Sequence, residues 1–397
     1  MPLPSSLEIR LAPGLAEVPA AAWDALTSPD DPFTEHAFLL AMEDSGSVGA
    51  QAGWLPQHVL VHEHGHLVGA MPLYLKTHSY GEYIFDWGWA DAAQRAGIAY
   101  YPKLVSAVPF TPATGRRLLV GARPDGAEAA TIEQALLSGA LHLARAAQAS
   151  SLHVLFCPQD QHERLCELGM IGRKTFQFHW ENDGYADFED WLSRFRSRRR
   201  KECRRERRLP EGVVVLDLPG GALSLRQQAR VRAMYEDTCD KRGGHAYLHP
   251  EHFELFWTDL AHRSRVLLAE EGGRTVAMAL LFQRGGHLYG RYWGCRPGYE
   301  GLHFELCYHR PIEICITEGL RRFEAGAQGT HKIHRGLLPS PTWSAHWLDH
   351  AGLAGAVAQA CARERRATET QMAELAAHGP LHRESDTPGG ASDAPCG

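Results

Sequence analysis

The side chains best suited to chemistry gather in one short segment, residues 322–335 (RFEAGAQGTHKIHR). Glu324 ends a predicted strand and can act as a general base, directly or through water. A solvated strand carboxylate is the alternative and fits the sequence equally well. Four residues that can hold a phosphate or a carboxylate follow within five positions: His331, Lys332, His334 and Arg335.

The glycines of the same segment suit a close approach of backbone to a ligand. Gly326 and Gly329 carry no side chain, so their N–H groups can face a bound group. A plain turn explains them equally well. We expect Glu324 and His331 to take part in catalysis. We expect five residues to bind a cofactor: Gly326, Gln328, Gly329, Lys332 and Arg335.

A second group lies in an aromatic stretch, residues 290–294 (GRYWG). Strand alternation predicts Arg291 and Trp293 on one face and Tyr292 on the other. An arginine directed at a cleft suits an acidic acceptor, and a cation–π contact inside the sheet is the alternative. We expect Arg291 to be catalytic, Trp293 to contact the cofactor and Tyr292 to contact the substrate.

Two stretches of the N-terminal half hold the same position in the order of predicted elements as residues 290–294 hold in the C-terminal half. Residues 82–89 (EYIFDWGW) predict an aromatic strand, and residues 100–119 form a proline-bearing insertion. Long insertions of this kind are more often functional than idle. We therefore expect six residues of these stretches to bind the substrate: Asp86, Trp87, Trp89, Lys103, Thr111 and Arg117.

Metal and covalent chemistry have little support. His62, His64 and His66 alternate, but a hairpin turn falls among them and no carboxylate or cysteine spacing completes a site. No Gly-x-Ser-x-Gly motif occurs. The nine cysteines form no Cys-x-x-Cys pair, which favours a reducing compartment. We expect no metal, direct attack rather than a covalent intermediate, and a cytoplasmic protein.

Length and composition bound the architecture. The 397 residues exceed one ordinary core and suit two domains. The chain is 44% apolar, yet no run approaches the ~20 apolar residues that a membrane span needs. The N-terminus has no basic region followed by an apolar core, so we expect no secretory signal. A net charge of −6 argues against a DNA-binding surface but allows a local basic patch.

The elements that position the second group can be predicted. Apolar runs at 266–269 and 276–282 flank Gly272-Gly273, which predicts a β-hairpin. Three elements follow: a strand over 286–294, a helix over 302–318 and a strand over 322–325.

The N-terminal half repeats this order. A hairpin over 59–75 precedes the aromatic strand over 82–89, and Val68 lies 208 positions before Val276, as Trp87 lies 206 before Trp293. We infer two copies of one unit, the alternative being an order common to α/β proteins. Further elements are predicted over 19–26, 36–44, 131–148 and 351–378 as helices, and over 152–156 and 175–180 as strands.

A basic run lies between the two copies. Residues 194–208 (RFRSRRRKECRRERR) hold ten Lys or Arg and two Glu, a local net charge of +8. Pro210 ends the predicted helix. Such a run is usually a solvated helix face, and the functional interpretation is a phosphate-binding face for a nucleotide or an RNA. Residues 379–397 are polar and predicted to be disordered.

The order hairpin, strand, helix, strand resembles the core of GNAT-type acyltransferases. The basic run and Gly212-Val-Val-Val215 resemble the opening of the second GNAT-like domain of Fem-type peptidoglycan aminoacyltransferases. Over roughly residues 30 to 375 the chain resembles Fem-like predicted N-acyltransferases. The motifs are HSYGEYIFDWGWAD (78–91), YYPKLVSAVPFTPATGRRLL (100–119), GRYWG (290–294), LHFELCYHRPIEICI (302–316) and FEAGAQGTHKIHRG (323–336).

This resemblance implies an α/β (α+β) fold of two tandem GNAT-like domains, 1–185 and 186–378, each a mixed twisted sheet flanked by helices. It implies an N-acyltransferase whose donor, acyl-CoA or aminoacyl-tRNA, lies where two parallel strands splay apart. The acceptor would be an amine of a small molecule or peptide, including a peptidoglycan precursor. A tRNA donor would contact residues 194–208.

One departure keeps other functions open. The glycine loop that usually cradles pyrophosphate before the helix is here residues 296–301 (RPGYEG), with a different glycine spacing. One alternative is a catalytically silent protein that recognises a cell-wall peptide or precursor. Another is an RNA-binding protein that works through residues 194–208.

Overall fold

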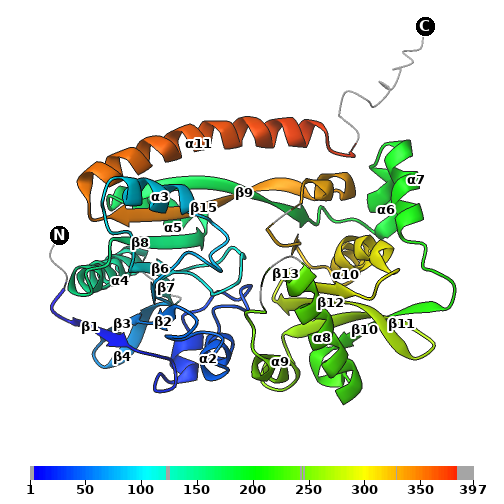
Figure 1. Cartoon of the computed structure of the whole chain (residues 1–397), viewed down its shortest axis with the longest axis horizontal. Coiled ribbons are helices and arrows are strands. Elements are labelled where there is room, and N and C mark those ends of the chain that lie inside the picture. Colours follow the sequence, from blue (N-terminus) through cyan, green and yellow to red (C-terminus); the bar gives the residue numbers. More distant parts are fainter. Residues whose placement is uncertain (1–3, 122–125, 242–243, 245, 328, 382–397) are drawn as a thin grey trace, which may run out of the picture.

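The computed structural model describes residues 4–121, 126–241, 244, 246–327 and 329–381, so most of the predicted tail lies outside the described residues. The strands form two sheets (Figure 1). The small sheet has the order β1 (Leu7–Ala12), β3 (His58–Glu63), β4 (His66–Met71) and β7 (Leu119–Val120). The large sheet has eleven strands, in the order β10 (Val213–Pro219), β11 (Ser264–Glu271), β12 (Arg274–Arg284), β13 (His287–Cys295), β14 (Arg322–Glu324), β9 (Ile171–Glu181), β15 (Leu338–Leu348), β8 (Ser151–Cys157), β6 (Lys103–Ser106), β5 (Tyr74–Lys76) and β2 (Trp54–Pro56).

Helices cover both sheets. α4 packs on the small sheet, α8 lies against β12 and β13, and α11 runs along β9 and β15 (Figure 1). None of the described helices combines the length and apolar character needed to cross a bilayer. The helices are α1 (Ala20–Asp24), α2 (His36–Asp44), α3 (Trp87–Arg95), α4 (Gly126–Ala146), α5 (Gln159–Glu167), α6 (Phe188–Ser193), α7 (Ser197–Glu206), α8 (Leu225–Lys241), α9 (Pro250–Trp257), α10 (Arg310–Thr317) and α11 (Ala351–Ala377).

Both predicted hairpins are confirmed. β11 and β12 pair antiparallel around Gly272 and Gly273, whose φ angles of 54° and 72° are those that a two-residue hairpin turn needs. β3 and β4 pair around His64 and Gly65, with φ angles of 51° and 82°. The two hairpins belong to different sheets, because β3 and β4 lie in the small one.

A parallel strand pair occurs once in each half. β13 pairs parallel to β14 with α10 between them in the chain, and β6 pairs parallel to β8 with α4 between them. The order strand, helix, parallel strand is therefore present twice, as the repeated sequence pattern predicts. In the N-terminal half the first strand of this order is β6, and not the stretch over 82–89 that the sequence predicts.

The predicted aromatic strand over 82–89 is wrong. Tyr83 has a φ of 61°, which a strand does not allow, and α3 begins at Trp87. The cause is electrostatic: Glu82 and Asp86 turn inward to the buried ammonium of Lys103. Trp87 is thus a helical residue, and its match to a strand tryptophan in the second half does not hold.

The helix predicted over 302–318 is present but irregular. A 3₁₀ turn at Glu300–Leu302 and a π-helical segment at Glu305–His309 precede α10. Pro311 lies in the first turn of α10 and has no N–H to donate, which suits a site where the helix changes its winding.

Two long strands join the halves. β9 pairs with β14 of the C-terminal half, and β15 pairs with both β9 and β8. β15 is absent from the sequence predictions, as are α8 and α9. The predicted strand over 175–180 is the central part of β9.

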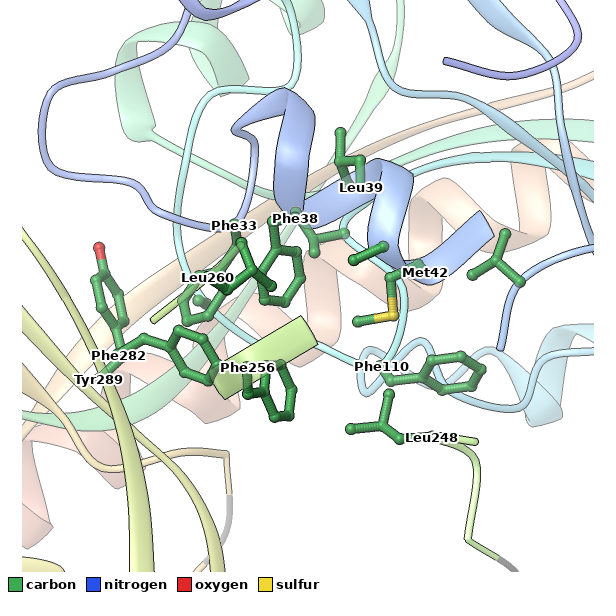
Figure 2. Packing of buried hydrophobic residues seen from close by; sticks show 14 of the residues in the cluster. Phe33, Phe38, Leu39, Met42, Phe110, Leu248, Phe256, Leu260, Phe282 and Tyr289 are labelled. Atoms are coloured by element: carbon green, nitrogen blue, oxygen red, sulfur yellow. The ribbon is translucent and has the colours of Figure 1, made fainter. Parts of the chain in front are cut away.

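One hydrophobic core spans both halves. Figure 2 shows Phe38 of α2 beside Phe256 of α9 and Phe282 of β12. The rings of Phe38 and Phe282 lie 5.7 Å apart, and those of Phe33 and Tyr289 lie 5.0 Å apart. Each fully buried side chain of this size contributes about 1.5–3 kcal/mol, so the shared core fixes the two halves against each other.

Candidate functional site

Glu324 lies where the parallel ladder ends. β13 and β14 pair from His287 with Arg322 to Tyr289 with Glu324, and β14 stops there while β13 continues to Cys295. Backbone groups of β13 beyond this point have no ladder partner on β14. Such free N–H and C=O groups are those that a ligand amide or ester can bind.

The Glu324 carboxylate is buried, and only one of its two oxygens accepts a hydrogen bond from the described residues. The residue is 3% exposed, and its Oε2 lies 3.4 Å from the Thr114 amide nitrogen and 3.7 Å from His179 Nε2. Its Oε1 accepts no hydrogen bond among the described residues. Burial raises the pKa of Glu324 to about 7, because it outweighs the attraction of Arg322, whose Nη1 lies 3.8 Å away. A carboxylate of this pKa can accept a proton near neutral pH.

His179 does not supply the missing charge. Burial and the nearby cations lower the pKa of His179 to about 3, so its imidazole is neutral. The sequence predictions missed His179, although a signal existed. In the strand predicted over 175–180 the aromatic residues alternate with Gln177 and His179, which places a polar pair on the opposite face.

A segment of the N-terminal half, residues 110–114 (FTPAT), covers this strand end, and we call it the bridging segment. Arg291 Nη2 donates to the Phe110 carbonyl at 2.5 Å and lies 3.3 Å from the Thr111 hydroxyl oxygen. Gln177 Nε2 donates to another carbonyl of the segment at 2.9 Å. Arg291 and Thr111 are thus brought together at one end of the bridging segment, whose other end contacts Glu324 through Thr114. Arg291 holds the segment in place.

The face predicted for Arg291 is wrong. The pairing of β13 with β12 skips Arg291, which makes it the extra residue of a β-bulge and breaks the alternation. Its guanidinium lies 5.3 Å from the ring of Tyr292 and 5.6 Å from that of Phe33. Trp293 instead packs edge-on against His303 at 5.2 Å. Arg291 and Tyr292 therefore share a side, and Trp293 lies on the other.

Lys332 lies beside the strand end as well, in the 3₁₀ turn Thr330–Arg335. Its buried Nζ donates to the Gly326 carbonyl at 2.6 Å, and burial lowers its pKa to about 7. His331 is exposed, with Nε2 2.9 Å from the Tyr308 hydroxyl. Gln328 lies outside the described residues. Gly326 has a φ of 81°, which suits a residue without a side chain.

Arg335 is occupied by protein partners. Its Nη2 and Nε donate to the two oxygens of Glu206 at 2.6 and 3.0 Å, and its guanidinium stacks 3.4 Å from the centroid of the Phe304 ring. His309 also lies 2.9 Å from Glu206. With Cys203 these form a His, Cys and Glu group within metal-ligand reach. Both Glu206 oxygens already accept hydrogen bonds from Arg335, so the ion pair of these two residues explains why the group lies together without a metal ion.

Two of the residues predicted in the N-terminal half, Asp86 and Lys103, form a separate buried ion cluster with Lys76 and Glu82. Lys103 Nζ donates to Glu82 Oε2 at 2.9 Å and contacts Asp86. Burial raises the pKa of Glu82 to about 7 and lowers that of Lys76 to about 7. Burial alone would raise the pKa of Asp86, but Lys103 lowers it to about 2. No contact among the described residues joins this cluster to Glu324.

The other residues predicted to bind the substrate lie in different parts of the N-terminal half. Trp89 packs under Arg173 at 4.9 Å and against His346 at 4.8 Å, whereas Trp87 is 38% exposed. Arg117 is fully buried and donates to the carbonyls of Leu155 and Ala113 at 2.9 and 2.8 Å. Its guanidinium serves the fold, and its predicted role in substrate binding stays a prediction.

The basic run forms α7, which lies beside α6 (Figure 1). Arg198, Lys201 and Arg205 lie three and four positions apart and are exposed, so they share one helix face. Arg198 pairs with Glu202 at 3.3 Å. In the described part of the chain, Lys201 and Arg205 have no carboxylate partner. This basic face can bind successive phosphates.

The chain is similar to known proteins over most of its length. A model of the FemAB-like family, described as peptidoglycan biosynthesis/recognition, matches residues 14–383. The structure of FemX is 13% identical over 88% of this chain and 100% of that chain, with a TM-score of 0.54. A conserved Bacteroides thetaiotaomicron protein of unknown function is 10% identical over 85% and 99%, with a TM-score of 0.50. A tandem GNAT protein from the clavulanic acid pathway is 12% identical over 86% and 98%, with a TM-score of 0.42. A search of curated proteins found no match. The expected mixed α/β fold is confirmed.

Proposed function

This chain belongs to the FemAB-like family, and from that premise we propose that it transfers an acyl or aminoacyl group from an activated donor to an amine. The observation that carries the proposal is Glu324, a buried carboxyl with a pKa of about 7 at the end of a parallel strand pair. Its Oε1 has no hydrogen-bond donor among the described residues, so it is free to accept a proton.

The reaction needs few groups. The amine nitrogen attacks the donor carbonyl, the new C–N bond forms, and the C–O or C–S bond to the carrier breaks. Glu324 takes the proton that the amine loses, and the carrier leaves as a hydroxyl or thiol after gaining a proton. No oxidant or metal is required. The glycines around Gly326 supply N–H groups for the developing oxyanion.

The donor is an aminoacyl-tRNA or an acyl-CoA. The exposed cationic face of α7, with Lys201 and Arg205 free of carboxylates in the described chain, supports the RNA-borne donor. The changed glycine spacing in residues 296–301 weakens the case for ordinary coenzyme A binding. The family description supports a cell-wall peptide or its precursor as the acceptor.

A second candidate is recognition of a cell-wall peptide without catalysis. The observation that favours it is the burial of Glu324, which is 3% exposed beneath the bridging segment. A substrate reaches Glu324 only when residues 110–114 move. A protein that merely recognises the peptide has no need of that movement.

One assay separates the two candidates. The purified protein is incubated with charged tRNA or acyl-CoA and a lysine-bearing muropeptide, and the product is measured by mass spectrometry. Transfer by the wild type and by Glu181→Gln, but not by Glu324→Gln, supports the transferase. Glu181 is the matched control, because it is a half-exposed carboxylate on the neighbouring strand β9. Muropeptide binding without transfer from either donor supports recognition alone.

A further inference from the structure

A pocket of about 740 Å³ lies between the first half of α8 and the turn that joins β11 to β12. Short side chains make the hollow: Ala229 and Ala233 lie one helical turn apart on α8, and Gly273 faces them from the turn. A smaller hollow of about 360 Å³ adjoins it and shares Arg274 and Arg296. In Figure 1 α8 crosses in front of β12 and β13.

Four arginines line this arginine pocket: Arg226, Arg230, Arg274 and Arg296. Among the described residues none of the four has a carboxylate partner. Most arginines elsewhere in the structure are paired, and even Arg232 on the same helix lies 3.6 Å from Glu236. Four unpaired guanidiniums around one hollow are therefore a local excess of positive charge.

The carboxylate of the pocket wall offsets only one of these four charges. Glu270 is the acidic residue among the lining residues, and its Oε1 accepts from Gln227 Nε2 at 3.0 Å and from the Thr275 hydroxyl at 3.3 Å. Both donors are neutral groups. The lining thus holds four positive charges against one negative charge that is already hydrogen-bonded.

The helix adds to the positive potential. Arg226 lies in the first turn of α8, which has no acidic residue, and Arg230 lies one turn later on the same face. Helix starts ordinarily carry Asp or Glu, because the dipole is positive there. Two arginines at this end are unfavourable until an anion binds between them.

We propose that the arginine pocket binds a small molecule that carries two or more phosphate groups. Planar guanidiniums bind phosphate oxygens in pairs, and a volume of about 740 Å³ lies in the range of small-molecule sites. A concave site with four arginines around it suits a compact polyanion better than an extended RNA strand, for which the convex face of α7 is shaped. Arg296 opens the segment 296–301, whereas the other three arginines lie outside it. The proposal requires no transfer chemistry and does not depend on Glu324.

Isothermal titration calorimetry on the full chain tests this site with pyrophosphate, tripolyphosphate, orthophosphate and a 12-nucleotide RNA. We expect tripolyphosphate and pyrophosphate to bind more tightly than orthophosphate. Arg226→Gln/Arg230→Gln is expected to weaken both by about ten-fold or more, since each charge-assisted contact is worth roughly that factor. Lys201→Gln/Arg205→Gln on α7 is the matched control: it removes the same charge at the same spacing and leaves polyphosphate binding unchanged.

Three results would overturn the proposal. One is no heat from either polyphosphate. Another is an equal loss in both double variants, which would mean a diffuse field rather than a site. The third is tighter binding of the RNA than of tripolyphosphate with loss in Arg226→Gln/Arg230→Gln. Circular dichroism checks that the variants fold, and Arg274→Gln/Arg296→Gln repeats the test from the opposite wall.

Discussion

The Glu324 carboxylate lies 3.4 Å from the backbone nitrogen of Thr114, although 210 positions separate the two residues. The contact joins the last strand of the second parallel pair to a segment of the N-terminal half. It places the buried carboxyl beneath residues 110–114.

Activity should depend on the ionisation of Glu324. Because its pKa is raised to about 7, we expect kcat to rise with pH through about 7 and then to level off. Glu324→Gln should lose about 100-fold or more in turnover, the usual range for a general base. A rate profile from pH 5 to 9 checks this, with Glu181→Gln as the control. A flat profile in the wild type, or full turnover in Glu324→Gln, would remove Glu324 from the mechanism.

The same group should shape stability in the opposite direction. In the folded chain Glu324 keeps its proton up to about pH 7, whereas its ordinary pKa is 4.5. Between these values folding takes up a proton, so this group makes the free energy of unfolding fall as pH rises from about 4.5 to 7. Glu324→Gln removes this loss. We therefore expect the difference in Tm between Glu324→Gln and the wild type to become more positive as the pH rises from about 4.5 to 7. Scanning calorimetry measures this difference. Parallel curves of Tm against pH would contradict the buried titration.

The buried ion cluster of the N-terminal half should be sensitive to the loss of one partner. Lys103→Met leaves Asp86 without its ammonium, which costs about 3–5 kcal/mol for a buried pair. Urea unfolding measures this, and Lys103→Met/Asp86→Asn should recover part of the loss. The exposed pair of Lys174 and Glu369, 2.9 Å apart, is the comparison, since Lys174→Met should cost at most about 1 kcal/mol. Equal losses in the two single variants would mean that burial is not the cause.

RNA binding should reside on α7. Lys201→Gln/Arg205→Gln removes two phosphate contacts and should reduce the slope of log K against log salt by about 1.5. Filter binding of uncharged tRNA at several salt concentrations gives this slope. Arg226→Gln/Arg230→Gln should leave it unchanged, so the two double variants act as reciprocal controls. A slope that is the same in all three proteins would exclude α7 as the contact.

The sequence predicts those elements that interactions between neighbouring residues determine. The two hairpins, the last strand with Glu324 at its end, and the basic helix are all set by neighbouring residues. The partners of Glu324 were harder to predict, because Thr114 and His179 reach it only through the tertiary fold. The site residues predicted in the insertion are Lys103, Thr111 and Arg117, and the contact falls between the last two.

The wrong predictions have physical causes. The alternation in residues 82–89 is typical of a strand, but a buried ammonium at Lys103 draws two carboxylates out of that pattern. At Arg291 a bulge shifts the alternation by one residue, and one sequence gives no sign of it. β15 was missed because Pro339 and Pro341 interrupt its first half, where strand propensity is low. The domain boundary near residue 185 stays a prediction.

β15 lies between β8 and β9, and this has a consequence during synthesis. The ribosome makes β8 and β9 by Glu181, but the strand that fills the place between them is complete only at Leu348, 167 residues later. Domains usually fold as they emerge. Until then β8 has one unpaired edge and β9 has two, because β14 and β15, the partners of β9, are both made later. Such edges attract other chains. A nascent chain halted between these points is therefore the form of this protein most in need of a chaperone.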